Sequence, residues 1–143
     1  MTRALIGFAS LVVVAAACSD GGNGSGVDGN KRLTMLNDGE LRNVCTYITD
    51  LEGPERTVDC GNGQTITLGY PNGRRAAEID ECVASGLTFR AEFPNCENTV
   101  AEVEACYEAL DSLTDQQICG DTAIPAACDV LFEPSVACGG GQA

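Results

Sequence analysis

Three segments of the chain carry apolar residues at the spacing of an amphipathic helix. The first segment covers residues 38–51, and its apolar face consists of Leu41, Val44, Cys45, Ile48 and Leu51. Asn37 and Glu40 stand at the spacing of a helix-capping box, in which each side chain accepts a backbone hydrogen bond. Gly53 and Pro54 follow the last apolar position, so we expect the helix to end there.

The second and third segments have the same character. The second covers residues 74–85 and is expected to end at Gly86, with an inner face made of Ile79, Cys82 and Val83. The third begins at a capping box formed by Thr99 and Glu102, and its inner face consists of Val103, Cys106, Tyr107 and Leu110. Because each of these helices carries one cysteine on its apolar face, the pattern predicts a bundle cross-linked through its core.

Two further elements complete the expected fold. Short β-prone runs at residues 57–60 and 65–68 flank an Asn62-Gly63 pair, which is typical of a β-hairpin turn. A last short helix is expected near residues 125–132. The sequence therefore predicts a mainly α fold, a small disulfide-stapled helical domain with about three to four short helices and a short β-hairpin near residues 57–68.

Phe89 and Phe93 lie just before Pro94, beyond the expected end of the second helix. Two roles are open for this pair. The rings can cover the apolar interior of the bundle, which is the role we favour, or they can form an exposed loop that anchors a partner.

The start of the chain has the pattern of a secretory signal. Residues 1–17 contain Arg3, an apolar run over residues 4–14, and three alanines at the end. The run is shorter than the roughly 20 residues that a membrane-spanning helix needs. Residues 18–32 are rich in glycine and polar residues, so we expect a lipid-anchor cysteine followed by a flexible tether. The folded domain is expected over residues 33–138.

Cys18 follows the alanines directly, and residues 1–18 resemble the lipobox of bacterial lipoproteins. The resemblance implies that Cys18 carries acyl chains such as palmitate, and Ser19 in place of Asp implies the outer membrane. Two acyl chains suffice for stable anchoring, whereas one is marginal. Ala15 stands where this family prefers Leu, so ordinary cleavage and plain secretion remain the alternative.

Later features extend the resemblance. The spacing of Cys96, Thr99, Val100, Ala105 and Cys106 is similar to that of uncharacterised cysteine-rich lipoproteins of Gram-negative bacteria. This resemblance implies a cell-envelope location, with the membrane contacted through the N-terminal lipid, and a cross-linked helical fold. It implies no activity.

The cysteine count indicates a disulfide framework. The chain has nine cysteines, and setting Cys18 aside leaves an even set in an exported protein: Cys45, Cys60, Cys82, Cys96, Cys106, Cys119, Cys128 and Cys138. The spacing leaves the pairing open, and Cys82 with Cys96 is the local pair that we favour. The absence of histidine and of close cysteine pairs argues against a metal site.

Charge and composition limit the function. With 8 basic and 21 acidic residues and a net charge of −13, the chain is not expected to bind nucleic acid. It has no histidine to serve as a base for a nucleophile, and it has no nucleotide-binding glycine motif, so we expect neither catalysis nor a cofactor. Hydrolysis by paired carboxylates is the remaining enzymatic hypothesis.

The third helix carries Glu104, Glu108 and Asp111 in one stripe, which we place opposite its apolar face. The stripe can dock a basic partner or cations, or it can be a solvated helix face. Together these features predict a non-catalytic, lipid-anchored envelope protein that acts as a binding or structural module for an unknown envelope or extracellular protein. The alternative is a secreted, soluble, disulfide-rich inhibitor or effector without a lipid.

Overall fold

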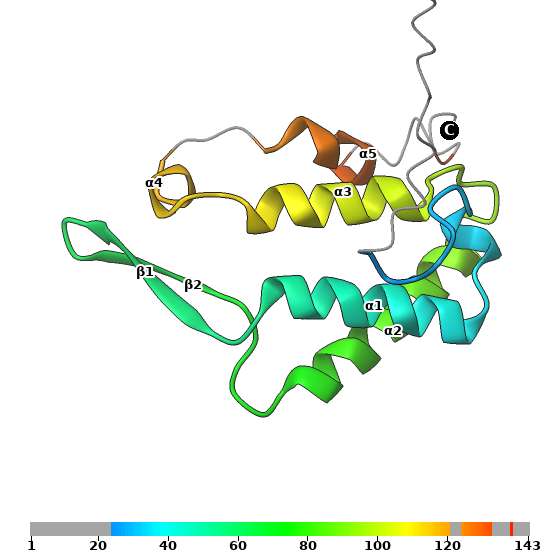
Figure 1. Ribbon diagram of the computed structural model, residues 1–143, viewed down its shortest axis with the longest axis horizontal. Helices are drawn as coiled ribbons and strands as arrows, with labels where there is room; N and C mark the ends of the chain where they lie inside the picture. Colours follow the sequence, from blue (N-terminus) through cyan, green and yellow to red (C-terminus); the bar gives the residue numbers. More distant parts are fainter. Residues whose placement is uncertain (1–23, 121–123, 133–137, 139–143) are drawn as a thin grey trace, which may run out of the picture.

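A computed structural model of the chain describes residues 24–120, 124–132 and 138. The expected signal over residues 1–17, Cys18 and the expected disordered tail over residues 139–143 lie outside the described residues. Within them the fold is mainly helical, with one antiparallel two-stranded sheet and four disulfides. The predicted fold class is therefore confirmed (Figure 1).

Helices α1 (Asp38–Glu52) and α3 (Val100–Asp111) begin and end close to the predicted positions. In both predicted capping boxes, each of the two side chains accepts a backbone hydrogen bond: Asn37 with Glu40 in α1, and Thr99 with Glu102 in α3. A short 3-10 helix, η1 (Leu33–Met35), precedes α1. The two capping-box predictions are confirmed.

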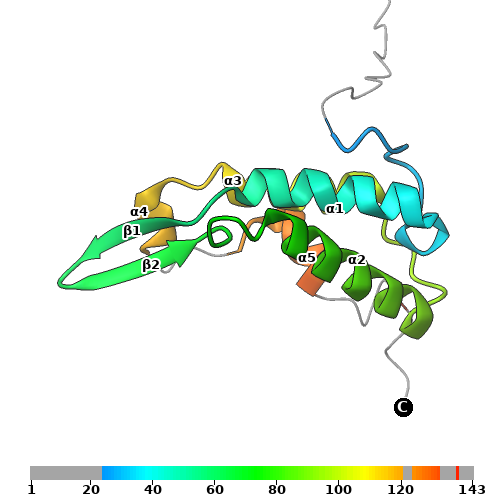
Figure 2. The ribbon, with the colours of Figure 1, turned by 90° about the horizontal axis from the view of Figure 1, so that it is seen from below.

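Helices α1 and α3 lie side by side and run in the same direction, whereas α2 runs in the opposite direction (Figures 1 and 2). The shared direction begins at the amino-terminal ends, where Arg32 and Thr99 form an isolated antiparallel bridge. The backbone N–H of Val100 donates to the carbonyl of Lys31, and that of Leu33 donates to Asn98. These bonds start both helices at the same place in the molecule.

The core is small and aliphatic, and it fills the space where α1 meets α2 and α3. Its buried members are Leu36, Leu41, Val44, Cys45, Ile48, Ile79, Val100 and Val103. Val27, Val83 and Tyr107 pack against it as partly buried residues. A core of this size leaves a modest free energy of unfolding, to which the disulfides add.

Helix α2 covers Arg75–Glu92, so the prediction that it ends at Gly86 is wrong. Gly86 lies inside the helix, where an added Cβ atom would come within 2.8 Å of Cδ1 of Leu41 in α1. The glycine therefore permits a close approach of α2 to α1 and is not a helix stop. The low helix propensity of glycine costs about 1 kcal/mol, which this packing opposes.

The longer α2 also changes the setting of Phe89 and Phe93. Phe89 belongs to the last turns of the helix and Phe93 caps it, so these residues do not form the exposed loop that was the alternative role. Both rings are partly buried and their centroids lie 5.3 Å apart. Beside them Arg90 donates to the backbone carbonyl of Leu36 at 2.6 Å, which ties the end of α2 to the start of α1.

The predicted hairpin is confirmed, with strands β1 (Arg56–Gly61) and β2 (Gln64–Leu68). Asn62 and Gly63 form the turn, and both have positive φ values, of 52° and 77°. Asn-Gly tolerates this conformation, which suits the twist of a two-residue hairpin. The hairpin projects beyond the carboxyl-terminal ends of α1 and α3 (Figure 1).

The carboxyl-terminal part contains short elements. The predicted last helix is present as a 3-10 helix, η2 (Ala126–Cys128), followed by α5 (Asp129–Phe132). Helix α4 (Asp115–Ile118) was not predicted, although Thr114 and Gln117 form a third capping box at its start. A single helical turn is too short to show an apolar repeat, so the box was its only sequence signal.

The described disulfides involve all eight cysteines of the predicted framework. Cys45 pairs with Cys82, Cys60 with Cys119, Cys96 with Cys138, and Cys106 with Cys128. The favoured pair of Cys82 with Cys96 is therefore wrong. Cys82 lies on the face of α2 that packs on α1, so its partner comes from α1 and not from the loop that follows α2.

The segment predicted to be a tether needs a correction over residues 24–32, which pack against α3. The N–H of Ala101 donates to the carbonyl of Gly29, the N–H of Ser25 donates to the carboxylate of Glu104 at 2.9 Å, and Val27 contacts the core. The glycines that suggested flexibility allow this close approach, since a Cβ at Gly29 would lie 3.1 Å from Cβ of Ala101. The described residues leave the earlier part of the tether, 18–23, untested.

Gly86→Leu is expected to lower the melting temperature of the oxidised protein. The new side chain would collide with Leu41 at the contact between α1 and α2, and overpacking of this kind costs about 1–3 kcal/mol. Ala84→Leu is a matched control, because Ala84 is exposed in the same helix and its replacement should change stability by less than about 0.5 kcal/mol. Equal melting temperatures for the two variants would contradict the close approach.

Candidate functional site

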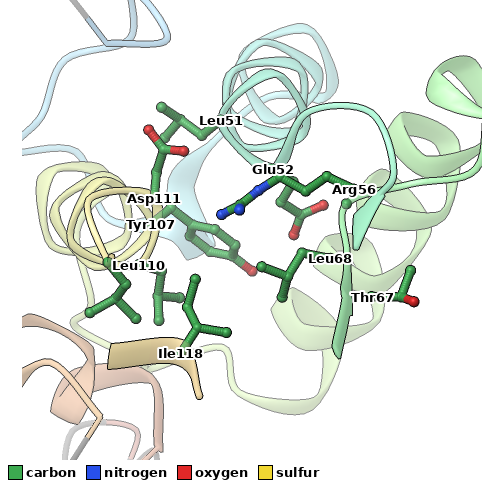
Figure 3. A pocket seen from close by; sticks show the side chains of 11 residues that line it. Leu51, Glu52, Arg56, Thr67, Leu68, Tyr107, Leu110, Asp111 and Ile118 are labelled. Atoms are coloured by element: carbon green, nitrogen blue, oxygen red, sulfur yellow. The ribbon is translucent and has the colours of Figure 1, made fainter. Parts of the chain in front are cut away.

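A cleft of about 420 Å³ opens at the end of the bundle, between the carboxyl-terminal ends of α1 and α3, strand β2 and helix α4 (Figure 3). Its volume lies in the range of ligand pockets, about 300–1,000 Å³. Its aliphatic lining comes from all four elements and from the loop after α3: Leu51, Leu68, Leu110, Leu113 and Ile118. The ring of Tyr107 points into the cleft, and Leu110 keeps 37% of its surface exposed.

Charged side chains stand at the opening of this apolar cleft. Glu52 and Asp111 are the last residues of α1 and α3, and Arg56 is the first residue of β1. Arg56 binds Asp115 of α4 at 3.0 Å. Among the ion pairs of the described residues, none includes Glu52 or Asp111.

The cleft raises the pKa of two of its residues. Loss of hydration raises the pKa of the Glu52 carboxyl above its ordinary value, and the nearby charge of Glu78 on α2 adds to the shift. Loss of hydration also raises the pKa of Tyr107, with a further contribution from the charge of Glu52. Glu52 retains exposed surface, so it stands at the boundary between water and the apolar walls.

The position of the cleft walls depends on a covalent link. The Cys60–Cys119 disulfide joins β1 to the residue that follows α4, and it closes a loop with a sequence separation of 59. The Arg56–Asp115 ion pair joins the same two elements, but both side chains are exposed, so its contribution is small. The disulfide therefore provides most of the restraint between the hairpin and α4.

A second cavity, of about 510 Å³, lies between α1, α2 and α3. Most of its lining belongs to the hydrophobic core, including Leu41, Val44 and Ile48. Glu52 and Tyr107 line both cavities, so these two residues stand between the cleft and the core. Carboxylates line the second cavity too, those of Glu78 and Glu81 among them. We regard the first cavity as the candidate site because none of its lining residues belongs to the buried core.

The three residues of the predicted acidic stripe lie in different surroundings. Glu104 accepts the backbone hydrogen bond of Ser25, and Glu108 accepts the hydroxyl hydrogen bond of Tyr47 at 2.6 Å. The bond to Glu108 and the surrounding acidic charge raise the pKa of Tyr47 to about 12. Asp111 instead lines the cleft.

The stripe therefore does not lie opposite the apolar face, and its binding of a partner stays a prediction. It runs beside the contact with α1, and two of its three carboxylates are bound within the protein. The described residues offer neither a metal site nor a membrane-spanning helix. They contain no cluster of acidic or cysteine side chains suited to a metal ion. No helix among them has the length and apolar character to span a bilayer.

Glu52, Arg56 and Tyr107 were not identified from the sequence. The sequence pattern placed Tyr107 on an inner helix face. It did not distinguish Glu52 and Arg56 from the many other polar and charged residues of the chain. One signal was present: Glu52 and Asp111 each end a helix, and neither helix has a basic residue in its last turn. A helix end of this type is electrostatically unfavourable.

A comparison of the chain with models of protein families, with curated proteins and with solved structures finds no match.

Glu52→Gln is expected to raise the melting temperature slightly at neutral pH. Folding raises the pKa of Glu52, so the folded chain holds this proton more strongly, and stability is lost as the pH rises through that raised pKa. Glutamine cannot ionise and removes the loss. Melting curves measured by circular dichroism should converge for variant and wild type below the ordinary pKa of glutamate, about 4.3.

Glu92→Gln provides the control for this measurement, because Glu92 is exposed in the last turn of α2, away from the cleft. It changes the net charge by the same amount, and because Arg90 lies in the last turn of α2 and no buried wall adjoins Glu92, its melting temperature should rise less than that of Glu52→Gln. An equal rise in both variants would attribute the effect to net charge and would contradict the role of the cleft.

Proposed function

We propose that the protein is a non-catalytic, lipid-anchored binding module of the bacterial cell envelope, and that the cleft at the end of the bundle is its binding site. The observation that supports the proposal is that aliphatic walls and two carboxylates, those of Glu52 and Asp111, line one cleft, and that neither carboxylate has an ion-pair partner among the described residues. A cleft with an apolar interior and a few polar groups is the usual form of a ligand site.

The rigidity of the fold supports binding. The disulfides join α1 to α2, the hairpin to the end of α4, and α3 to η2. Walls that are already ordered lose little conformational entropy when a partner binds, so more of the contact energy contributes to affinity. A cross-linked domain is also suited to an oxidising compartment.

The nature of the side chains supports a non-catalytic role. The chain has no histidine, and all eight described cysteines are in disulfides. Lys31 binds Glu40 at 2.6 Å beside the start of α1, at the end of the bundle opposite the cleft. Loss of hydration raises the pKa of Tyr107 above its ordinary value, so the cleft disfavours the ionised form that a base would need.

The sequence of residues 1–18 supports the anchor, through its resemblance to a lipobox. The ordered contacts of residues 24–32 leave a short connection between Cys18 and the bundle. The domain would therefore lie close to the membrane surface. The alternative is a secreted inhibitor or effector that uses the same cleft without a lipid.

The mass of the native protein from its host distinguishes these two forms. We expect a chain that begins at Cys18 and carries acyl chains, with eight further cysteines that react with an alkylating agent only after reduction. Cys18→Ser should lose the acyl mass and leave the membrane fraction. A native protein without acyl mass would support the secreted alternative, and a free thiol before reduction would contradict the disulfide set.

Photo-crosslinking in the host tests the cleft as the binding site. A photoreactive phenylalanine derivative in place of Leu110 is expected to form a defined adduct, because this residue lines the cleft and is partly exposed. The same derivative in place of Ala84, which is exposed on α2, should form none. Adducts at both positions, or at neither, would show that partners do not bind at the cleft.

A further inference from the structure

The two helices that bound the cleft direct the same end toward it. Because α1 and α3 run in the same direction, their carboxyl-terminal ends lie together beside the hairpin (Figures 1 and 2). Each such end carries a partial negative charge of about half a unit, which arises from the unpaired carbonyl groups of the last turn. The cleft therefore receives the negative ends of two helix dipoles.

The side chains at these ends add to the negative potential. α1 ends at Glu52 and α3 ends at Asp111, and neither helix has a basic residue in its last turn. At the opposite ends of the same helices, Glu40 and Glu102 complement the positive ends through their capping boxes. The molecule thus complements its helix dipoles at one end and opposes them at the other.

The described neighbours only partly compensate this charge. Among the described residues, Arg56 is the one basic residue that lines the cleft, and Asp115 already binds its guanidinium. The two carboxylates that line the cleft, those of Glu52 and Asp111, therefore share it with one guanidinium that already has a partner in Asp115. Glu78 on α2 adds further negative charge near Glu52.

The walls below the carboxylates suit the methylene groups of a long cationic side chain. Leu51, Leu68 and Leu110 line the cleft together with the ring of Tyr107 (Figure 3). Lysine and arginine bury their aliphatic parts against such walls while the charged end stays at the polar opening. The face of a tyrosine ring also attracts a cation.

We propose that the cleft takes a lysine or arginine side chain of a partner protein, with its aliphatic part against Leu68 and Tyr107 and its charged end at Glu52 and Asp111. This inference rests on the proposed function and adds the chemistry of the ligand. The carboxylates supply the charge complementarity, and the apolar walls exclude water from the contact and so strengthen it.

Peptide titration of the native, oxidised protein tests the inference. The probe is the capped tripeptide acetyl-Gly-Lys-Gly-amide, and the matched probe replaces lysine with norleucine, which has a similar aliphatic side chain but no charge. We expect the lysine peptide to shift the NMR signals of Leu51, Leu68 and Leu110 and to bind at least about fivefold more tightly than the norleucine peptide.

Substitutions of single carboxylates distinguish binding at the cleft from general attraction to the acidic surface. Glu52→Gln and Asp111→Asn should each reduce the affinity for the lysine peptide by about fivefold. Glu92→Gln, which removes the same charge at the other end of α2, should leave the affinity unchanged. The NMR spectrum and melting temperature of each variant show whether it is folded, so a loss of binding can be assigned to the carboxylate.

Several results would overturn the inference. Equal binding of the norleucine peptide at the cleft would show that the site recognises apolar groups, and it would leave the proposed function intact. Equal losses in all three variants would indicate nonspecific attraction to an acidic protein. Larger shifts of the same signals with Ca²⁺ alone would make a metal ion the occupant. An absence of shifts with the lysine peptide would also reject the inference, while crosslinking at Leu110 still decides the proposed function.

Discussion

The cleft depends on one packing arrangement, the contact between the parallel helices α1 and α3. Parallel neighbours bring the same ends of their dipoles together, which is unfavourable. The opposing contributions are the burial of Val44, Ile48, Val100 and Val103 and the backbone bonds between the segments that precede the two helices. Because both helices begin beside the Arg32–Thr99 bridge and have similar lengths, both end beside the hairpin. The place where the negative ends meet thus follows from the place where the helices begin.

The disulfides act differently in the two halves of the molecule. Cys45–Cys82 and Cys106–Cys128 join elements that already pack on the core, so they mainly destabilise the unfolded chain. Cys60–Cys119 instead joins a projecting hairpin to a helix of a single turn. A two-stranded hairpin is marginal without such support, and on β1 only Val58 is buried. The walls that the hairpin and α4 form therefore depend on this disulfide, whereas the walls that α1 and α3 form depend on packing.

The local part of the fold could be predicted from the sequence, and the non-local part could not. The capping boxes at Asn37 and Thr99 and the Asn62-Gly63 turn act within a few residues, so the elements that they begin or connect were predicted correctly. Gly86 was misjudged because its role is to fit Leu41, which lies far away in the chain. The disulfide pairing and the candidate site were missed for the same reason, because both depend on contacts between residues that lie far apart in the chain. Asp111 was identified as an acidic residue, but its place beside Glu52 depends on how α1 packs on α3, which periodicity does not show.

The cleft differs from the rest of the acidic surface in how its charge is held. Glu40, Glu104 and Glu108 have partners within the protein, so their charge is used to stabilise the fold. Exposed carboxylates attract any cation weakly, and salt screens that attraction. Glu52 is set against apolar walls that raise its pKa, and the same loss of hydration strengthens its interaction with an opposite charge. A cationic side chain that fills the cleft would therefore gain both a favourable charge contact and burial of its methylene groups. An acidic surface alone provides only the first of these contributions, so the cleft can bind a cationic side chain more selectively than the surrounding acidic surface can.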